Sequence, residues 1–330
     1  MVECDLRFGR YCSPFADNHF NQDMENADAR PMISSFSPPW LSSICIKGTN
    51  KPFENLLSVK HYLDTPVFTP IEDLEIGSDL GSFVGKDHYP IPAVSDREGY
   101  HKDRHYDWWM SGLRDCICAK RTLMRHGLSL NPGDNVFELG CASGRVLRHF
   151  ACQETGLTIW GADIQLRHVE WIRKFLPERI RVFQNSVLPQ LPLESNSQKL
   201  VYGFSVFTHI DDFELAWLAE LRRILIPGGI AYLTIHSERT WKNMNPEWPL
   251  WKGLNRHKDE IPDYEISADL FKGPMPAQKT VFWWTTGQNY NAQVFHSEDY
   301  IRNAWGRFFS IKEIIAAGYD YQDVVVLQKK

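Results

Sequence analysis

The sequence predicts an α/β fold built on a doubly wound, mostly parallel sheet. Its central stretch is a short apolar run at residues 135–139 that passes directly into a Gly-Cys-Ala-Ser-Gly turn at residues 140–144. After this turn, Val146, Leu147 and Phe150 fall at helical spacing. Apolar runs and amphipathic stretches then alternate along the chain, which is the order that a parallel sheet with crossover helices requires.

The glycine turn favours some ligands over others. Glycines let the backbone approach a ligand at a helix N-terminus, so a nucleotide-like ligand is the first hypothesis. A dinucleotide fingerprint needs three glycines, whereas only Gly140 and Gly144 are present, and the Gly-Lys-Ser/Thr ending of a Walker loop is absent. The apolar run at residues 157–164 carries Asp163 at its end, where such folds hold ribose hydroxyls. Glu138, just before the turn, suits a cationic or hydroxyl-bearing ligand more than a pyrophosphate. An adenosine ligand without phosphates therefore fits this pattern better than NAD.

The remaining elements follow in order. Residues 180–184 predict the third strand, 199–206 the fourth and 230–235 the fifth. Asp211 and Glu214 have the spacing of a capping box, so we expect Asp211 to cap the helix that follows the fourth strand rather than to act as a catalytic acid.

The end of the chain completes the sheet. Ser297 is the expected N-cap of a helix over residues 297–305. Residues 308–315 and 321–327 then supply the last strands.

Four segments resemble, in the same order, the motifs of class I S-adenosylmethionine-dependent methyltransferases. The sequence looks like a member of a bacterial-type branch that acts on small molecules or glycans. The segments are ELGCASGR (138–145), GADI (161–164), FSVFTHI (204–210) and LRRILIPGG (221–229). The resemblance is strong over residues 128–235 and returns at residues 296–330. It implies a seven-stranded Rossmann-like methyltransferase sheet with an antiparallel last strand, and S-adenosyl-L-methionine as cofactor.

The resemblance also implies where the cofactor lies. The turn at residues 140–144 approaches its amino-acid and ribose portion, Glu138 orients the turn or receives the amino group through water, and Asp163 accepts both ribose hydroxyls. Ser186 stands where the family often has an acid, so the adenine contact falls to its hydroxyl or to the backbone of Val187. The expected cofactor-binding residues are Glu138, Gly140, Cys141, Ala142, Gly144, Asp163, Ile164, Asn185, Ser186, Val187, Ser205 and Tyr106.

Two histidines are candidates for a catalytic base. His209 follows the fourth predicted strand and His236 follows the fifth, which places both at the edge where doubly wound sheets bind ligands. A hydroxyl acceptor must lose its proton during methyl transfer, and an imidazole with a pKa near 6.5 suits that task. We expect His209 to be the base, with His236 as the second candidate; a structural role remains open for both.

The chain divides into an N-terminal extension (1–99), a cofactor-binding core (100–236), an insertion (237–295) and a C-terminal completion of the sheet (296–330). The insertion replaces a short crossover and is rich in aromatic residues, so we expect an acceptor-binding cap that contains a hairpin over residues 279–295. Its candidate substrate-binding residues are Trp241, Trp283, Trp284 and Tyr290.

Packing alternatives remain open for these aromatic residues. A tryptophan-rich mini-core explains the insertion equally well. Tyr106, Trp108 and Trp109, on a helix expected over residues 100–127, either cover the cofactor or simply pack. The extension either packs on the core or shapes the acceptor site or a dimer.

Composition narrows the class of protein. A net charge of −5 and a pI near 6.2 disfavour a nucleic-acid partner, as does FSVFTH in place of the Asn/Asp-Pro-Pro-Tyr motif of amino-methylases. Seven cysteines without a C-x-x-C pair indicate reduced thiols and no metal site, and with no signal or membrane-spanning segment we expect a cytoplasmic protein.

We expect O-methylation of a sugar or glycan terminus, because relatives of this appearance often accompany glycosyltransferases. A small amine acceptor and a non-catalytic cofactor-binding scaffold are the alternatives, and the oligomeric state is not determined.

Overall fold

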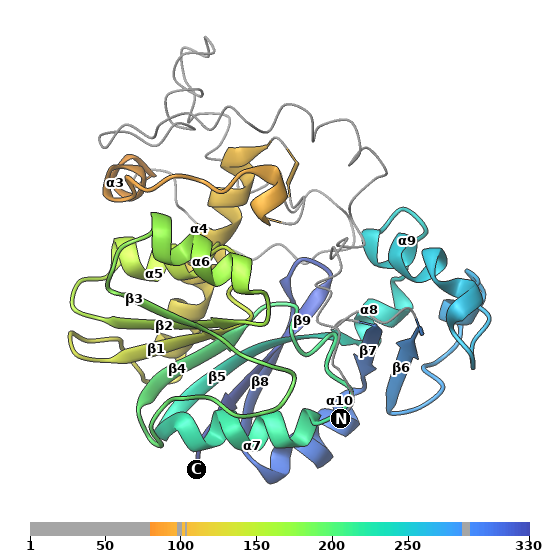
Figure 1. Cartoon of the computed structure of the whole chain (residues 1–330). Helices are drawn as coiled ribbons and strands as arrows, with labels where there is room; N and C mark the ends of the chain where they lie inside the picture. Colours follow the sequence, from red (N-terminus) through yellow and green to blue (C-terminus); the bar gives the residue numbers. More distant parts are fainter. Residues whose placement is uncertain (1–79, 98–100, 103, 286–290) are drawn as a thin grey trace, which may run out of the picture.

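The structure is a computed structural model that describes residues 80–97, 101–102, 104–285 and 291–330 (Figure 1). The candidate Tyr290 and most of the N-terminal extension lie outside these ranges. Among the helices of the described ranges, none combines the length and the apolar character needed to cross a bilayer.

The sheet confirms the predicted doubly wound arrangement. Five parallel strands lie in the order β3-β2-β1-β4-β5. Their bounds are β1 (Asn135–Leu139), β2 (Thr158–Asp163), β3 (Ile180–Gln184), β4 (Gln198–Gly203) and β5 (Leu225–Ser237). β9 (Gln322–Gln328) runs antiparallel to β5, and β8 (Ser310–Tyr319) runs antiparallel to β9. The last strand is therefore antiparallel to the five central strands, as expected.

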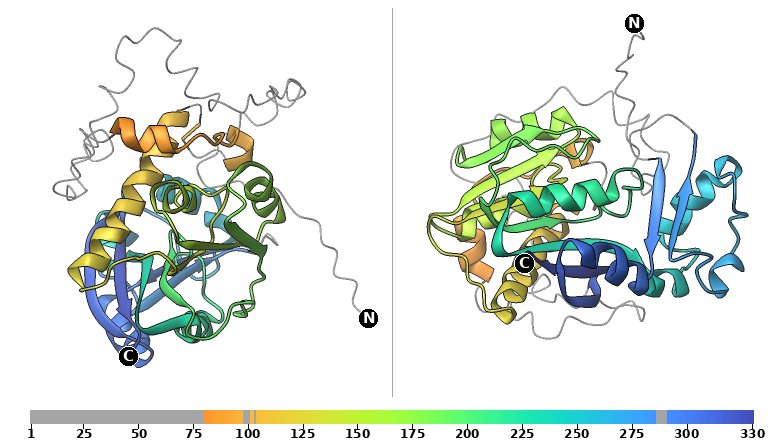
Figure 2. Two further views of the ribbon diagram at one scale, coloured as in Figure 1. Left: turned by 90° about the vertical axis from the view of Figure 1, so that its left-hand side faces the viewer. Right: turned by 90° about the horizontal axis from the view of Figure 1, so that it is seen from below.

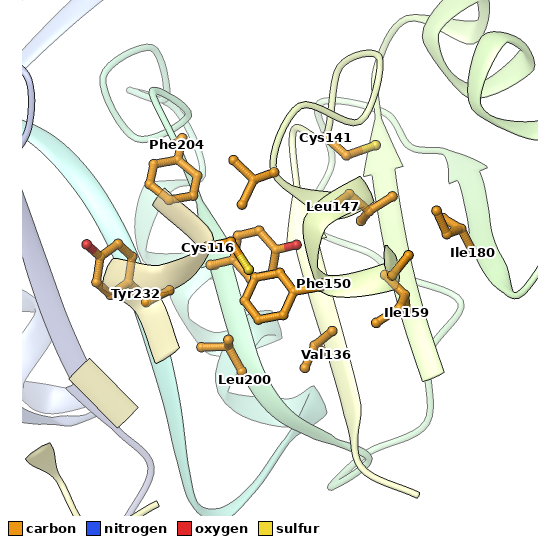
Figure 3. Close-up of a cluster of buried hydrophobic side chains, with 14 of the residues drawn as sticks. Cys116, Val136, Cys141, Leu147, Phe150, Ile159, Ile180, Leu200, Phe204 and Tyr232 are labelled. Atoms are coloured by element: carbon orange, nitrogen blue, oxygen red, sulfur yellow. The ribbon is translucent and has the colours of Figure 1, made fainter. Parts of the chain in front are cut away.

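Helices cover both faces of the sheet (Figure 1). One face packs against α4 (His105–Arg125), α5 (Leu147–Gln153) and α6 (Leu166–Phe175), and its core includes Phe150 and Leu200 (Figure 3). The ring centroids of Phe150 and Tyr202 in this core lie 5.0 Å apart. The other face packs against α7 (Glu214–Ile224), α10 (Glu298–Ala304) and the short helix η7 (Trp305–Arg307). Two separate apolar cores thus hold the sheet, and the carboxyl ends of its parallel strands meet at one edge.

The insertion adds two strands to the seven that were expected. β6 (Lys279–Trp283) and β7 (Ala292–His296) form the predicted antiparallel hairpin, and β7 pairs in parallel with the end of β5 through His236 and Phe295. The insertion also contains α8 (Glu238–Lys242), α9 (Pro249–Arg256) and the short helices η5 (Lys258–Glu260) and η6 (Leu270–Lys272). Figure 2 shows these elements together at one end of the molecule, beyond the ends of β4 and β5.

The predicted capping box at Asp211 is wrong. The N-cap of α7 is Phe213, in a left-handed conformation (φ 60°) and without a side-chain cap. Asp211 and Glu214 instead form ion pairs with Lys279 of β6, whose Nζ lies 2.8 Å from Asp211 Oδ1 and 2.6 Å from Glu214 Oε2. Glu214 also accepts a hydrogen bond from Trp305 Nε1 at 2.5 Å. A buried carboxylate therefore joins α7, the hairpin and η7.

A buried ion pair anchors the residues that precede α4. Asp87, between α3 (Leu80–Lys86) and η4 (Val94–Arg97), accepts two hydrogen bonds of 2.7 Å from Arg148 of α5 and one of 2.6 Å from Trp109 Nε1. Neither Asp87 nor Arg148 is exposed to solvent. Burial alone would raise the pKa of Asp87, but Arg148 outweighs it and the pKa lies below its usual value. Trp109 therefore does more than fill space, because its indole N–H donates a hydrogen bond to this carboxylate.

Replacing Asp87 by alanine should lower the free energy of unfolding by about 3 to 5 kcal/mol, because it leaves the Arg148 charge buried without its partner. Urea unfolding measures this change. Since the folded-state pKa of Asp87 is depressed, its stabilisation is present above about pH 4 and is lost as the pH falls further. The difference between wild type and variant should shrink at acid pH. Lys252→Ala, which removes an exposed pair with Glu247, is the control and should have no measurable effect.

Candidate functional site

The turn after β1 has a backbone that only glycine accommodates at two positions. Gly140 and Gly144 have φ angles of 72° and 82°. A Cβ atom at Gly140 would lie 2.5 Å from Val206 Cγ2, and one at Gly144 would lie 2.8 Å from Leu176 Cδ1. Ala142 between them also has a positive φ of 43°. The turn is therefore tight and packed from two sides, and it places backbone amides at the carboxyl edge of the sheet.

Asp163, at the tip of β2, is hydrogen-bonded to this turn. Its Oδ2 accepts a hydrogen bond of 2.8 Å from the Ala142 amide, and its Oδ1 accepts one of 2.8 Å from the Gln165 amide. His168 Nδ1 lies 3.3 Å from Oδ1. A carboxylate oxygen has two lone pairs, so these amides leave acceptor capacity on the carboxylate. The predicted ribose-binding acid thus also holds the ends of the first two strands together.

Glu138 lies on β1, two residues before Gly140, and is almost fully buried. Its Oε2 has no hydrogen-bond partner among the described residues. Burial raises the pKa of Glu138 well above its usual value, although the positive charge of Arg145 lowers it in part. Arg145 itself is paired with Asp115 of α4 at 2.6 Å. A cation placed beside Glu138 would favour the ionised carboxylate.

The segment that precedes α4 lies across the turn, and the sequence did not predict this contact. Ser143 Oγ donates a hydrogen bond of 2.6 Å to the carbonyl oxygen of Asp96, in η4. Arg167 of α6 donates to the carbonyl oxygen of Ser95 at 3.3 Å. Tyr106, in the first turn of α4, is buried with its ring centroid 6.0 Å from that of Trp109. The glycine turn is therefore contacted by η4, in the segment that leads into α4.

The residues expected beside the adenine lie after β3. The Asn185 amide donates to the carbonyl oxygen of Asp163 at 3.1 Å, which keeps this loop against the tip of β2. Val187 and Leu188 are each more than half exposed, although both are apolar. The exposed Ser186 uses its hydroxyl to accept a hydrogen bond from the Leu188 amide at 3.2 Å. Two uncovered apolar side chains at this edge offer a surface that a flat ring can cover.

The other predicted residues of this region have structural partners. Ile164 is half-buried, and its carbonyl oxygen accepts a hydrogen bond from Gln184 at 2.9 Å. Cys141 is buried beneath the turn, where burial raises the pKa of its thiol well above the usual value. The predicted cofactor contacts of both residues stay predictions.

His209 is held in a defined orientation. Its Nδ1 lies 2.9 Å from the carbonyl oxygen of Ala292 in β7, which requires Nδ1 to be the protonated nitrogen and leaves Nε2 as the acceptor. Burial lowers the pKa of His209 below its usual value, although the hydrogen bond to Ala292 raises it in part. The imidazole is therefore neutral at pH 7, as a base must be.

His236, at the end of β5, is more deeply buried. Its ring centroid lies 5.0 Å from that of Phe295 and 5.8 Å from that of Tyr321, and its Nδ1 has no hydrogen-bond partner in the described residues. Burial, and then the nearby His209 and His296, hold its pKa well below the usual value. The structure thus brings both predicted histidines to one edge.

A hydrogen-bond network holds the turn that carries His209. Ser205, with a left-handed φ of 57°, donates its amide to Thr234 Oγ1 at 2.7 Å, and its Oγ accepts from Gln322 Nε2 at 2.7 Å. Thr208 Oγ1 donates to the Ser205 carbonyl oxygen at 2.9 Å. Gln322 and Thr234 were not among the predicted site residues, because only the pairing of β9 with β5 brings them together.

The aromatic candidates of the insertion separate into two groups. Trp241 is fully buried, and its Nε1 donates to the Gly273 carbonyl oxygen at 2.9 Å, so it occupies the mini-core that was the alternative prediction. Trp284 is also buried and stacks on His257 with ring centroids 4.6 Å apart. Trp283 of β6 is 43% exposed and can contact a ligand directly. In the described residues, no group of three or more acidic, histidine or cysteine side chains is placed to hold a metal ion.

Comparison with known proteins adds a family. Residues 137–233 match the family described as a methyltransferase domain. No curated protein matches the chain. Among solved structures, one similar chain is a putative S-adenosyl-L-methionine-dependent methyltransferase from Methanococcus maripaludis, with 18% identity, coverage of 71% of this chain and 94% of that chain, and a TM-score of 0.44. Another is the Burkholderia thailandensis 1,6-didemethyltoxoflavin-N1-methyltransferase, with 14% identity, 70% and 84% coverage, and a TM-score of 0.44. TM-scores below 0.5 are too low to support a conclusion about function.

Replacing Asp163 by alanine should weaken binding of S-adenosylhomocysteine at least about tenfold, because it removes both the predicted acceptor for ribose hydroxyls and the bond that holds Ala142. Isothermal titration calorimetry measures the affinity. Asp134→Ala is the matched control, since that aspartate lies at the opposite end of the sheet, where it pairs with Lys199. Unchanged affinity in the Asp163 variant would reject the assignment.

Proposed function

We propose that this S-adenosylmethionine-dependent methyltransferase transfers its methyl group to a hydroxyl of a small molecule, such as a sugar or a glycan terminus. The match of residues 137–233 to a methyltransferase domain supports the reaction class, and the motifs that resemble S-adenosylmethionine-dependent enzymes support the methyl donor. The single observation that carries the choice of a hydroxyl is the orientation of His209 by Ala292, which presents an unprotonated Nε2. An amine that arrives neutral needs no such base, whereas a hydroxyl does.

The residues of the crevice fit the methyl donor. The partnerless, buried Oε2 of Glu138 suits its amino group, and the Asp163 carboxylate suits its ribose hydroxyls. The uncovered side chains of Val187 and Leu188 suit its adenine. When bound, S-adenosylmethionine supplies a methyl group activated by a sulfonium centre.

The residues of this chain then have two tasks. The glycine turn, Asp163 and the loop after β3 hold the donor in place, and orientation of two reactants contributes up to roughly 7 to 11 kcal/mol in well-aligned systems. His209 takes the proton of the acceptor hydroxyl on Nε2 while Nδ1–H keeps its bond to the Ala292 carbonyl oxygen. His236 remains the second candidate for the base.

We further propose that residues 237–295 form the acceptor-binding cap. The hairpin is fixed to the core by the Lys279–Glu214 pair at 2.6 Å and by a backbone hydrogen bond of 2.8 Å from Val294 to Thr208. It therefore stands beside the turn that carries His209. Its mini-core makes the cap rigid, and Trp283 offers an exposed ring face for a sugar.

Incubation of the protein with labelled S-adenosylmethionine and fractions of small hydroxylated metabolites tests the proposal. Mass spectrometry of the labelled product should identify an O-methyl ether. A labelled N-methyl product would reject the choice of a hydroxyl, and cofactor binding without any labelled product would reject catalysis.

Replacing His209 by asparagine should lower kcat by about 10²- to 10⁴-fold, because the general base is lost while the fold is kept. In the wild type, kcat/KM should be flat above about pH 6.5 and should fall at more acid pH, since the lowered pKa of His209 places its protonation below that value. Steady-state kinetics across pH checks both points. Affinity for S-adenosylhomocysteine should stay nearly unchanged; a fully active variant would remove His209 as the base.

A further inference from the structure

Three buried polar atoms without partners meet at the edge of the sheet where β5 ends. They are His236 Nδ1, Gln293 Oε1 and Gln322 Oε1, and none has a hydrogen-bond partner in the part of the chain that the structure describes. The three side chains are only 2%, 4% and 3% exposed. Because a buried polar group without a partner is costly, such groups in a native protein call for a missing partner such as a ligand or water.

The strand pairing places these side chains on one face. His236 pairs with Phe295 of β7, and the short distance of 5.0 Å between their ring centroids shows that they share a face. Gln293 lies two residues before Phe295 on the same strand, so it lies on the same face.

On the other side of β5, Thr234 pairs with Val324 of β9. His236 lies two residues after Thr234 and Gln322 lies two residues before Val324. Because the strands are antiparallel, both are displaced in the same direction and lie on the same face as this pair. Ser205 confirms the placement, because it bonds both Thr234 Oγ1 and Gln322 Nε2 at 2.7 Å. The three partnerless atoms therefore surround the end of β5.

The same position adjoins the proposed base. Ala292, whose carbonyl oxygen orients His209, precedes Gln293 directly. Ser205, bonded by Gln322, belongs to the turn that carries His209. Both glutamines therefore adjoin elements that hold His209 in place.

We propose that His236, Gln293 and Gln322 form a recognition site for neighbouring hydroxyl groups of the acceptor. The inference rests on the proposed function and deepens it. The two glutamine oxygens accept hydrogen bonds and cannot donate them, so the ligand must supply at least two donors close together. A sugar ring, with several neighbouring hydroxyls, can present one hydroxyl to His209 and others to the glutamines, whereas a ring with a single hydroxyl at His209 leaves both glutamines without a partner.

Two small probes test the site without knowledge of the natural acceptor. Ligand-observed NMR titrations of the full chain with bound S-adenosylhomocysteine give the affinities of cis-cyclohexane-1,2-diol and of cyclohexanol. The diol should bind at least about tenfold more tightly, as expected for one additional hydrogen bond to a buried acceptor. Affinities that agree within about twofold would overturn the proposal, because water would then satisfy the glutamines as well as the ligand does.

Variants connect the preference to these residues. Gln293→Met keeps the shape of the side chain and removes its acceptor oxygen, so it should abolish the preference for the diol, whereas Gln293→Glu keeps the acceptor and should retain it. Gln198→Met is the matched control: Gln198 is also buried with a partnerless Oε1, but it lies at the start of β4, at the opposite edge of the sheet, and the preference should be unchanged. Thermal unfolding verifies that each variant is folded. A preference that survives Gln293→Met in a folded protein would overturn the proposal.

Methyl transfer to the same probes separates this inference from the proposed function. Selective binding of the diol without methylation of any hydroxylated compound would reject the function and keep the recognition site. Equal binding and equal methylation of both probes would keep the function and reject the site.

Discussion

The site depends on the hydrogen bonds that join the Asp163 carboxylate to the amides of Ala142 and Gln165. They fix the end of β2 against the tight turn after β1, so that the glycine turn and the acid form one rigid unit at the carboxyl edge of the sheet. The turn needs such support, because Ala142 has a positive φ angle that costs free energy in a residue with a Cβ atom. The pairing of the first two strands therefore sets the relative position of the turn and the acid.

Two buried carboxylates anchor elements on either side of the core. Asp87 holds the segment before α4 through Arg148, and Glu214 holds the hairpin of the insertion through Lys279. In each case a cation from a different element approaches within 2.7 Å of the carboxylate. Since a buried charge that loses its partner is strongly destabilising, each pair favours the arrangement in which its two elements meet. Charge pairing thus adds to apolar packing in holding these elements.

Burial also shifts the ionisation of the polar groups at this edge. It lowers the pKa of His209 and of His236 and raises the pKa of Glu138. In each case burial favours the neutral form of the group. Such a site avoids the cost of unpaired buried charges, and it favours ligands that bring a positive charge to Glu138 or hydroxyl donors to the histidines and glutamines.

The sequence by itself determined the doubly wound fold and the glycine turn. These features are local: the alternation of apolar runs, the glycines at 140 and 144 and the acid at the end of β2 are all visible within short windows. It also placed His209 and His236 at one edge, because the carboxyl ends of parallel strands always meet there.

Only the tertiary structure decided which distant residues lie beside the turn that carries His209. Gln322 reaches Ser205, and Gln293 adjoins the carbonyl oxygen that orients His209, through the register of β9 and β7 with β5. The same long-range pairing brought Lys279 to Asp211 and so removed the predicted helix cap, and the packing of the insertion buried Trp241 in its own core. Strand register between segments far apart in the chain depends on the sum of many contacts, and no single window of sequence contains that sum.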